Sequence, residues 1–139
     1  MAEMQNVNDN KDGENVVLCG ASSYTQKYFF NQQFAILPEQ IQQELHVTCV
    51  LFTEDVGGEF FMEFAPDGTL NLKVMAKQDD FLFDDIGSDL KIKQIRREKA
   101  EFLESLELYY KLIVLKKPIE EVGGDGPARQ LYENMKKTR

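Results

Sequence analysis

Hydrophobic and polar positions alternate most clearly between residues 59 and 76. In the later part of this stretch, Leu70, Leu72 and Val74 are separated by single residues that are mostly polar, which is the period of a strand with one buried face. The segment Pro66-Asp67-Gly68 interrupts the pattern with a proline that presets φ and a glycine that accepts positive φ. The pattern predicts a β-hairpin formed by residues 59–65 and 69–76.

A second pair of strands is predicted near the beginning of the chain. Val16–Cys19 and Gln26–Phe30 are separated by Gly20 and a pair of serines, and Val, Tyr and Phe are residues that fit a pleated surface. An alternative interpretation places the apolar residues of 30–37 on one face of a short helix. The strand–turn–strand interpretation is favoured.

Residues 38–57 have the features of a helix. Pro38 suits the first turn of a helix, and Gly57-Gly58 supplies a residue that can end it. Apolar residues recur at spacings of three and four, namely Ile41, Leu45, Cys49, Phe52 and Val56. The competing prediction is a strand over Val47–Thr53, which is rich in β-branched residues. The proline start and the double-glycine end favour the helix.

Val47, Val50 and Leu51 fall on the other side of that predicted helix. A helix that is apolar on two sides is usually covered on both sides, either by a sheet and a second helix or by two protomers. These three residues are therefore the candidate interaction surface.

The longest predicted element is a helix over residues 89–115. Ser88-Asp89 offers an N-cap, and an apolar stripe interrupted by Lys99 continues until Pro118 ends the helix. At ~1.5 Å per residue this helix would be about 40 Å long, which is about as wide as a compact domain of this size. Part of its surface is expected to protrude or to be shared with a partner.

The order β-β-α-β-β-α predicts the fold class α+β. We expect an antiparallel sheet of about four strands with two main helices packed on it, and a short C-terminal helix. Residues 1–15 are polar and acidic and are expected to form a disordered tail. Residues 16–117 form the single domain, and 118–139 hold a glycine-containing linker and the short helix over 128–137.

Charge and composition exclude several classes of function. Twenty-four acidic against 16 basic residues give a net charge of −8, which argues against partners that are nucleic acids or anionic membranes. The start of the chain has no signal-peptide pattern, and no apolar stretch approaches the ~20 residues of a membrane span. Cys19 and Cys49 lie in apolar segments, as buried reduced thiols do, so a cytoplasmic location is expected.

The basic cluster is the candidate anion-binding site. Lys93, Arg96 and Arg97 share one polar sector near the start of the predicted long helix, where cations oppose the helix dipole and need a compensating partner. That partner is either internal, with Arg97 pairing with Glu101, or an external small anion such as a nucleotide phosphate. Charge runs on helices are mostly solvated, so the anion site is the secondary hypothesis.

No catalytic or metal-binding pattern emerges. The aspartates between 79 and 89 do not follow the ligand order of a calcium loop, and the glycine-rich stretch 123–127 lacks the lysine and hydroxyl residue of a phosphate loop. His46 and Cys49 form the only local base–nucleophile pair, without positive neighbours or a helix cap to activate the thiol. We expect no enzyme activity, no metal and no cofactor.

Several stretches resemble a family of short uncharacterised bacterial proteins. They are 17–21, Leu37-Pro38-Glu39, 49–58, 83–88 and 91–99, and the resemblance continues to about Tyr110. It implies a bacterial cytosolic origin and transfers no catalytic or binding residue. The helix that is apolar on two sides and the long, protruding helix instead lead to the hypothesis of a non-enzymatic interaction domain that binds another protein or associates with itself as a homodimer.

Overall fold

Four antiparallel strands form one sheet in a computed structural model that describes residues 14–118, 129–130 and 133–134. Their order across the sheet is β2-β1-β3-β4. The bounds are β1 Val16–Ser22, β2 Lys27–Phe30, β3 Glu59–Phe64 and β4 Leu70–Met75. Both predicted hairpins are confirmed, the first by pairing of β1 with β2 and the second by pairing of β3 with β4.

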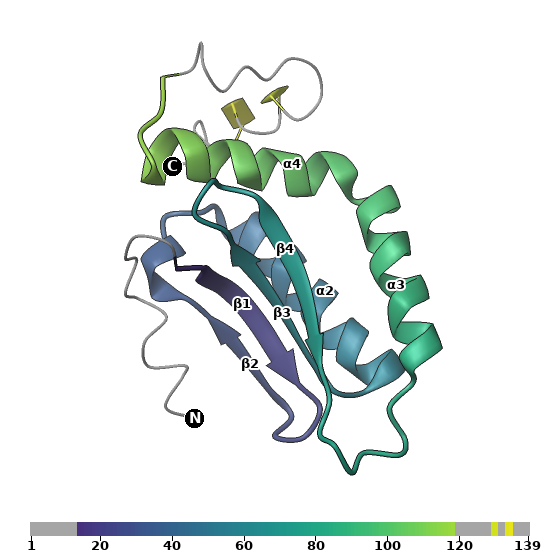
Figure 1. Cartoon of the computed structure of the whole chain (residues 1–139). Coiled ribbons are helices and arrows are strands. Elements are labelled where there is room, and N and C mark those ends of the chain that lie inside the picture. The colour runs from purple at the N-terminus through teal and green to yellow at the C-terminus, as the bar shows by residue number, and fades with distance from the viewer. Residues whose placement is uncertain (1–13, 119–128, 131–132, 135–139) are drawn as a thin grey trace.

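The helices lie on one side and at one end of this sheet (Figure 1). In that view α2 runs behind the strands and α4 crosses their upper end, while α3 stands beside β4. The bounds are η1 Gln32–Phe34, α2 Glu39–Val56, α3 Asp85–Glu98, α4 Ala100–Tyr109 and the π-helical turn η2 Tyr110–Val114. The predicted α+β class, with its four-stranded antiparallel sheet, is confirmed.

The two faces of the sheet differ in what covers them. On the inner face, Phe60, Met62 and Phe64 of β3 are fully buried in the hydrophobic core, and the Phe60 ring stacks on Phe52 of α2. The register shifts between Val17 and Cys19, so β1 contains a bulge that leaves Leu18 as an extra residue opposite β3. The outer face carries the alternate residues of each strand, and Figure 1 shows no described helix in front of it.

The helix predicted over residues 38–57 is confirmed as α2, and the competing strand over 47–53 is wrong. Pro38 is the N-cap, and Gly57 ends the helix with φ 84° while its N–H donates to the Thr53 carbonyl at 2.9 Å. The positive φ explains why a glycine stands at the end of this helix. Tertiary packing outweighs the β-branched composition of the segment.

The single helix predicted over 89–115 is two helices and a π turn. Helix α3 begins earlier, because the Asp84 carboxylate accepts from the Gly87 N–H at 2.8 Å and so replaces the predicted cap at Ser88-Asp89. The chain bends at Lys99, with φ −114° and ψ 26°, and continues as α4. The bend lets α3 pack along α2 while α4 crosses the end of the sheet (Figure 1).

Ion pairs hold α3 antiparallel to α2. Lys91 pairs with Asp55 near the start of α3, and Lys99 pairs with Glu44 at its end. Because residue numbers rise along one helix as they fall along the other, residues 44–55 of α2 lie level with residues 99–91 of α3. The lysine that interrupts the predicted apolar stripe therefore has a partner on another element.

The ends of the chain are described only in part. Residues 1–13 of the predicted acidic tail lie outside the described residues, as does most of the segment 118–139. Near the tail's end, the Asn15 side-chain amide donates to the carboxylate of Glu63 on the outer face. In the predicted C-terminal helix, residues 129–130 and 133–134 are helical, and the Arg129 guanidinium lies 2.9 Å from the Glu133 carboxylate.

Candidate functional site

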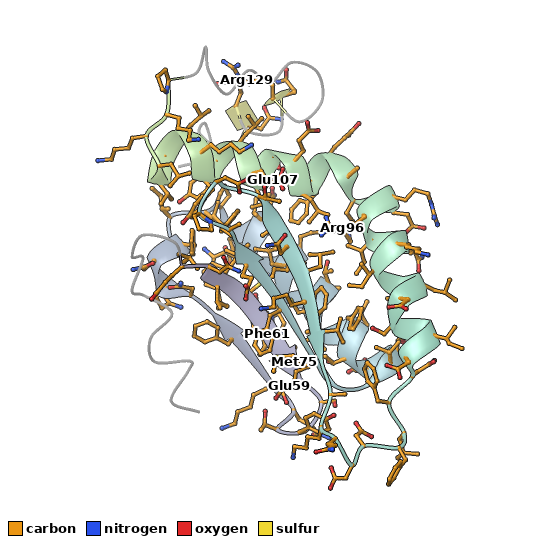
Figure 2. The ribbon with its side chains drawn as sticks, in the orientation of Figure 1. Glu59, Phe61, Met75, Arg96, Glu107 and Arg129 are labelled. Atoms are coloured by element: carbon orange, nitrogen blue, oxygen red, sulfur yellow. The ribbon has the colours of Figure 1, made fainter. Side chains whose placement is uncertain are left out.

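A row of aromatic residues crosses the outer face of the sheet. Gly20 of β1 pairs with Phe29 of β2 on one side and with Phe61 of β3 on the other, so the three residues lie side by side on that face. Phe29 and Phe61 are half-buried (Figure 2 labels Phe61). The Phe61 ring occupies the space above Gly20, where an added Cβ would overlap the ring and lie 2.8 Å from its Cε1.

This row forms the floor of a groove of about 540 Å³, which we call the outer-face groove. The next row toward the β1–β2 turn places Ser22 between Lys27 and Glu59, so a cation and an anion flank one side of the floor. The groove is lined by Gly20, Ala21, Ser22, Tyr24, Thr25, Lys27, Tyr28, Phe29, Glu59, Phe61 and Lys77. Met75, at the end of the same row as Glu59, is 54% exposed (Figure 2).

Tyr24 ties the β1–β2 turn to the segment that follows β4. Its hydroxyl donates to the Asp80 carboxylate at 2.6 Å and accepts from the Lys77 N–H at 3.0 Å, and the Lys77 ammonium lies 4.6 Å from the centre of its ring. The donated hydrogen bond lowers the pKa of Asp80. Partial desolvation, and then the bond to Asp80, raise the pKa of Tyr24. These contacts order one wall of the outer-face groove.

The predicted interaction surface is divided between two sides of α2. Val47 and Leu51 point away from the buried face of α2 and are 55% and 50% exposed. They line a second, smaller groove of about 190 Å³ between α2 and α3, together with Lys91 and Gln94. Val50 is half-buried and lies elsewhere, in a polar groove beside the β1–β2 turn. The structure thus brings together two of the three predicted residues.

The predicted anion-binding residues lie at the other end of their helix from the one expected. Arg96 and Arg97 occupy the last turn of α3, where cations are favoured by the helix dipole, and Lys93 stands one turn earlier. All three are exposed, and none lines any of the grooves described here. In the described part of the chain no ion pair joins Arg97 to Glu101. The helix dipole therefore gives these cations no need for an external anion.

The two cysteines meet in the core. The Sγ atoms of Cys19 on β1 and Cys49 on α2 lie 3.6 Å apart, and both thiols are free and fully buried. The Tyr28 hydroxyl is buried against them without a hydrogen-bond partner in the described chain, and its ring stacks on His46 at 4.2 Å between centroids. Burial and then the nearby thiols raise the pKa of Tyr28 far above its ordinary value.

This cluster lacks the features of a nucleophilic site. The hydrogen bond between Cys49 and Cys19, followed by burial, raises the pKa of Cys49, which favours the protonated thiol over the nucleophilic thiolate. His46 is the candidate base that the sequence places near these thiols. Its ring stacks on the Tyr28 ring, and the residue is exposed. Among the described residues, no three His, Cys, Asp or Glu side chains gather as a metal ion would require.

The aromatic floor was missed in the sequence because neither Phe29 nor Phe61 stands out there. Both lie in apolar segments in which residues of the two faces alternate, so a residue of the outer face looks like a core residue. The available signal was Gly20, since a glycine inside a strand often marks a close approach by another group. The register that sets Phe61 beside it depends on the bulge in β1.

Comparison with known proteins adds a family and no function. No curated protein and no solved structure matches the chain. Within the described residues, no helix has both the length and the hydropathy needed to cross a membrane. The model of a family of unknown function, DUF6145, matches residues 15–118, which include the whole sheet and helices α2 to α4. The chain therefore belongs to this family of unknown function, DUF6145.

Proposed function

We propose that this chain is a protein-binding domain without enzymatic activity, and that its outer-face groove receives an apolar side chain of the partner. The observation that carries the proposal is the position of Phe29 and Phe61, which are only partly buried and lie on a sheet face that no described helix covers. Aromatic residues on an open, well-ordered surface are the commonest anchors of protein interfaces.

The energetics of burial agree with this role. An aromatic side chain buries about 150–250 Å², so covering the smaller part of each ring that is still exposed removes on the order of 50 Å² from water. At about 25 cal/mol per Å², each ring contributes on the order of 1 kcal/mol to association. The flanking charges of Lys27 and Glu59 add orientation, because a partner segment must present opposite charges in the matching order.

Two observations support the non-enzymatic part of the proposal. The Cys49 thiol is buried with a raised pKa, and His46 is engaged by the Tyr28 ring, so neither is prepared for nucleophilic or base catalysis. A cytoplasmic location belongs to the same proposal, since free thiols 3.6 Å apart suit a reducing compartment.

The proposal is tested by affinity capture from the source cells with three variants compared against the wild-type chain. Phe29→Ser removes an anchor, and Lys27→Glu changes an exposed residue of the rim that the fold does not need. Ile113→Ser is the control, because Ile113 is an exposed apolar residue away from the groove. A protein captured by wild type and Ile113→Ser, but lost with both groove variants, supports the proposal. Equal capture by all four chains contradicts it.

A further inference from the structure

We propose that the free edge of β4 receives an extended, acidic segment of another protein as a fifth strand of the sheet. This edge is defined here by Leu72, Lys73 and Val74, and none of the three lines the outer-face groove. The inference is therefore separate from the proposed role of that groove, and either can fail without the other.

The pairing of β3 with β4 determines which backbone groups reach the edge. The Ala65 N–H donates to the Thr69 carbonyl at 2.8 Å, so these two residues form a hydrogen-bonded pair. Such pairs alternate along an antiparallel ladder, so every second residue of β4 turns its N–H and carbonyl away from β3. These residues are Leu70, Leu72 and Val74.

The first of these positions is occupied and the next two are open. The Leu70 N–H donates to the Glu107 carboxylate at 2.7 Å, which agrees with the direction derived for these groups. In the described part of the chain, no hydrogen bond reaches the N–H of Leu72 or Val74. Donors and acceptors that alternate along a sheet edge are the groups with which an extended segment pairs.

Helix α3 offers a surface for the added strand. It stands beside β4 while it packs on α2 (Figure 1), so a strand added to β4 would lie alongside it. Ile92 of α3 is half-buried against the core, and Arg96 lies one turn later on the side toward β4 (Figure 2). Arg96 is exposed and has no ion-pair partner in the described residues. It therefore favours an acidic segment.

Lys73 gives the segment a second reason to be acidic. Its side chain is 53% exposed, and its ammonium lies 3.4 Å from the Glu63 carboxylate on the outer face. Residues directly opposite one another on paired strands have Cβ atoms about 4.5–5.5 Å apart, so an acid opposite Lys73 would reach this ammonium. The complementary segment has an acid at that position and apolar residues on either side of it, opposite Leu72 and Val74.

A second copy of β4 fits this edge poorly. Pairing Leu72 of one copy with Val74 of the other sets the two Lys73 side chains directly opposite one another, where like charges repel. Pairing Leu72 with Leu72 needs the N–H of Leu70, which already donates to Glu107. A lysine on an edge strand is a common protection against pairing between identical sheets. The occupant is therefore a different chain.

Hydrogen exchange of backbone amides, measured by NMR on the full-length chain, tests whether the edge is open. The amides of Leu72 and Val74 should exchange at least tenfold faster than the amide of Lys73, which faces β3. Equal protection of the three amides would show that the chain itself covers this edge, and it would overturn the proposal.

Binding is tested with random peptides of about ten residues, displayed on phage and selected against the full-length chain. We expect selected peptides to carry an acid between apolar residues and to slow exchange of the Val74 amide at least tenfold. Val74→Pro removes the N–H at an edge position that accepts proline, and it should weaken peptide binding at least tenfold. Val74→Ala is the matched control, because it trims the side chain and keeps the N–H. No selected peptide, or equal weakening by both variants, overturns the proposal.

Two further variants keep the proposal testable if Val74→Pro fails to fold. Lys73→Gln should abolish the preference for an acid in the selected peptides, and an unchanged preference would contradict the proposed pairing. Phe29→Ser alters the outer-face groove and should leave the dissociation constant of a selected peptide within twofold of its wild-type value. Loss of binding with Phe29→Ser would place the peptide in the groove and exclude the edge as its site.

Discussion

The ring of Phe61 fills the space in which a side chain of Gly20 would stand, across the pairing of β1 with β3. The glycine gives the ring a backbone surface to lie on, and the ring in turn covers backbone that glycine leaves exposed. This relationship forms the centre of the outer-face groove, because Phe29 completes the same row.

Substitution of Gly20 by alanine should therefore destabilise the fold. The added Cβ overlaps the Phe61 ring and comes 3.0 Å from the Phe60 carbonyl oxygen, so the ring must leave its position. We expect Gly20→Ala to lower the free energy of unfolding by about 1–3 kcal/mol, the usual cost of overpacking. Urea denaturation of the two chains measures the difference.

Gly20→Ala in a Phe61→Ala background distinguishes the cost of overlap with the Phe61 ring from the cost of contact with the backbone. With the ring absent, only the Phe60 carbonyl restricts the new methyl group, so the cost of Gly20→Ala should fall to less than half. If Gly20→Ala lowers the free energy of unfolding by the same amount in that background, overlap with the Phe61 ring is not the source of the cost.

Glu107 should stabilise the junction of α4 with the sheet. Its carboxylate accepts a hydrogen bond at 2.7 Å from the N–H of Leu70, the first residue of β4 (Figure 2 labels Glu107). Glu107→Ala leaves this N–H without its partner, and we expect a loss of about 1–3 kcal/mol in the free energy of unfolding. Thermal and urea unfolding check the value.

Glu104 offers the comparison for Glu107. It lies one turn earlier on α4 and is exposed, so Glu104→Ala should change the free energy of unfolding by no more than about 0.5 kcal/mol. Glu107→Gln keeps an acceptor oxygen and should fall between wild type and Glu107→Ala. Similar losses at positions 104 and 107 would exclude a special role for the bond to Leu70.

The bond between Tyr24 and Asp80 should make stability depend on acid pH. It lowers the pKa of Asp80 in the folded chain, so the folded state favours the carboxylate more than the unfolded state does. That stabilisation is present above the ordinary pKa of about 4 and is lost as the pH falls through the folded value. Between pH 5 and pH 3, Asp80→Asn should lose stability less steeply than wild type. Asp79→Asn, whose side chain forms no hydrogen bond in the described chain, should retain the wild-type slope.

The paired thiols should be protected from alkylation while the chain is folded. Cys19 and Cys49 are fully buried, and the pKa of Cys49 is raised by its hydrogen-bonding neighbour and by burial. Iodoacetamide at pH 8 should modify them at least about 100-fold more slowly in the native chain than in urea. Mass spectrometry over time gives both rates. Rapid labelling of native protein would indicate that the layers of α2 and β1 open readily.

Local features predicted most of the fold. The turn at Pro66-Asp67-Gly68 specified the β3–β4 hairpin, and Pro38 with Gly57-Gly58 placed both ends of α2 to within a residue or two. These signals act on the backbone nearby, so they can be read without knowing the rest of the structure.

The break between α3 and α4 could not be read in that way. No glycine or proline marks it, and the apolar stripe passes through Lys99 without a change of period. What the sequence does not reveal is that Lys99 pairs with Glu44, a residue 55 positions away on α2. A contact of that separation depends on the tertiary arrangement of the helices.

The outer-face groove was not predicted from the sequence, for a related reason. The position of Val47 and Leu51 on the side of α2 opposite its buried face could be predicted from the helical periodicity of that one segment. The outer-face groove instead depends on the register of three strands and on the bulge near Leu18, which determines the face on which Phe61 appears.

The most direct test of the account is photocrosslinking inside the source cells with p-benzoylphenylalanine replacing Phe61. We expect a crosslink to a second protein that is absent when the same photoreactive residue replaces Ile113, an exposed position outside the groove. Absence of any crosslinked protein at position 61, or a crosslink only to a second copy, would contradict the proposed role of the outer-face groove.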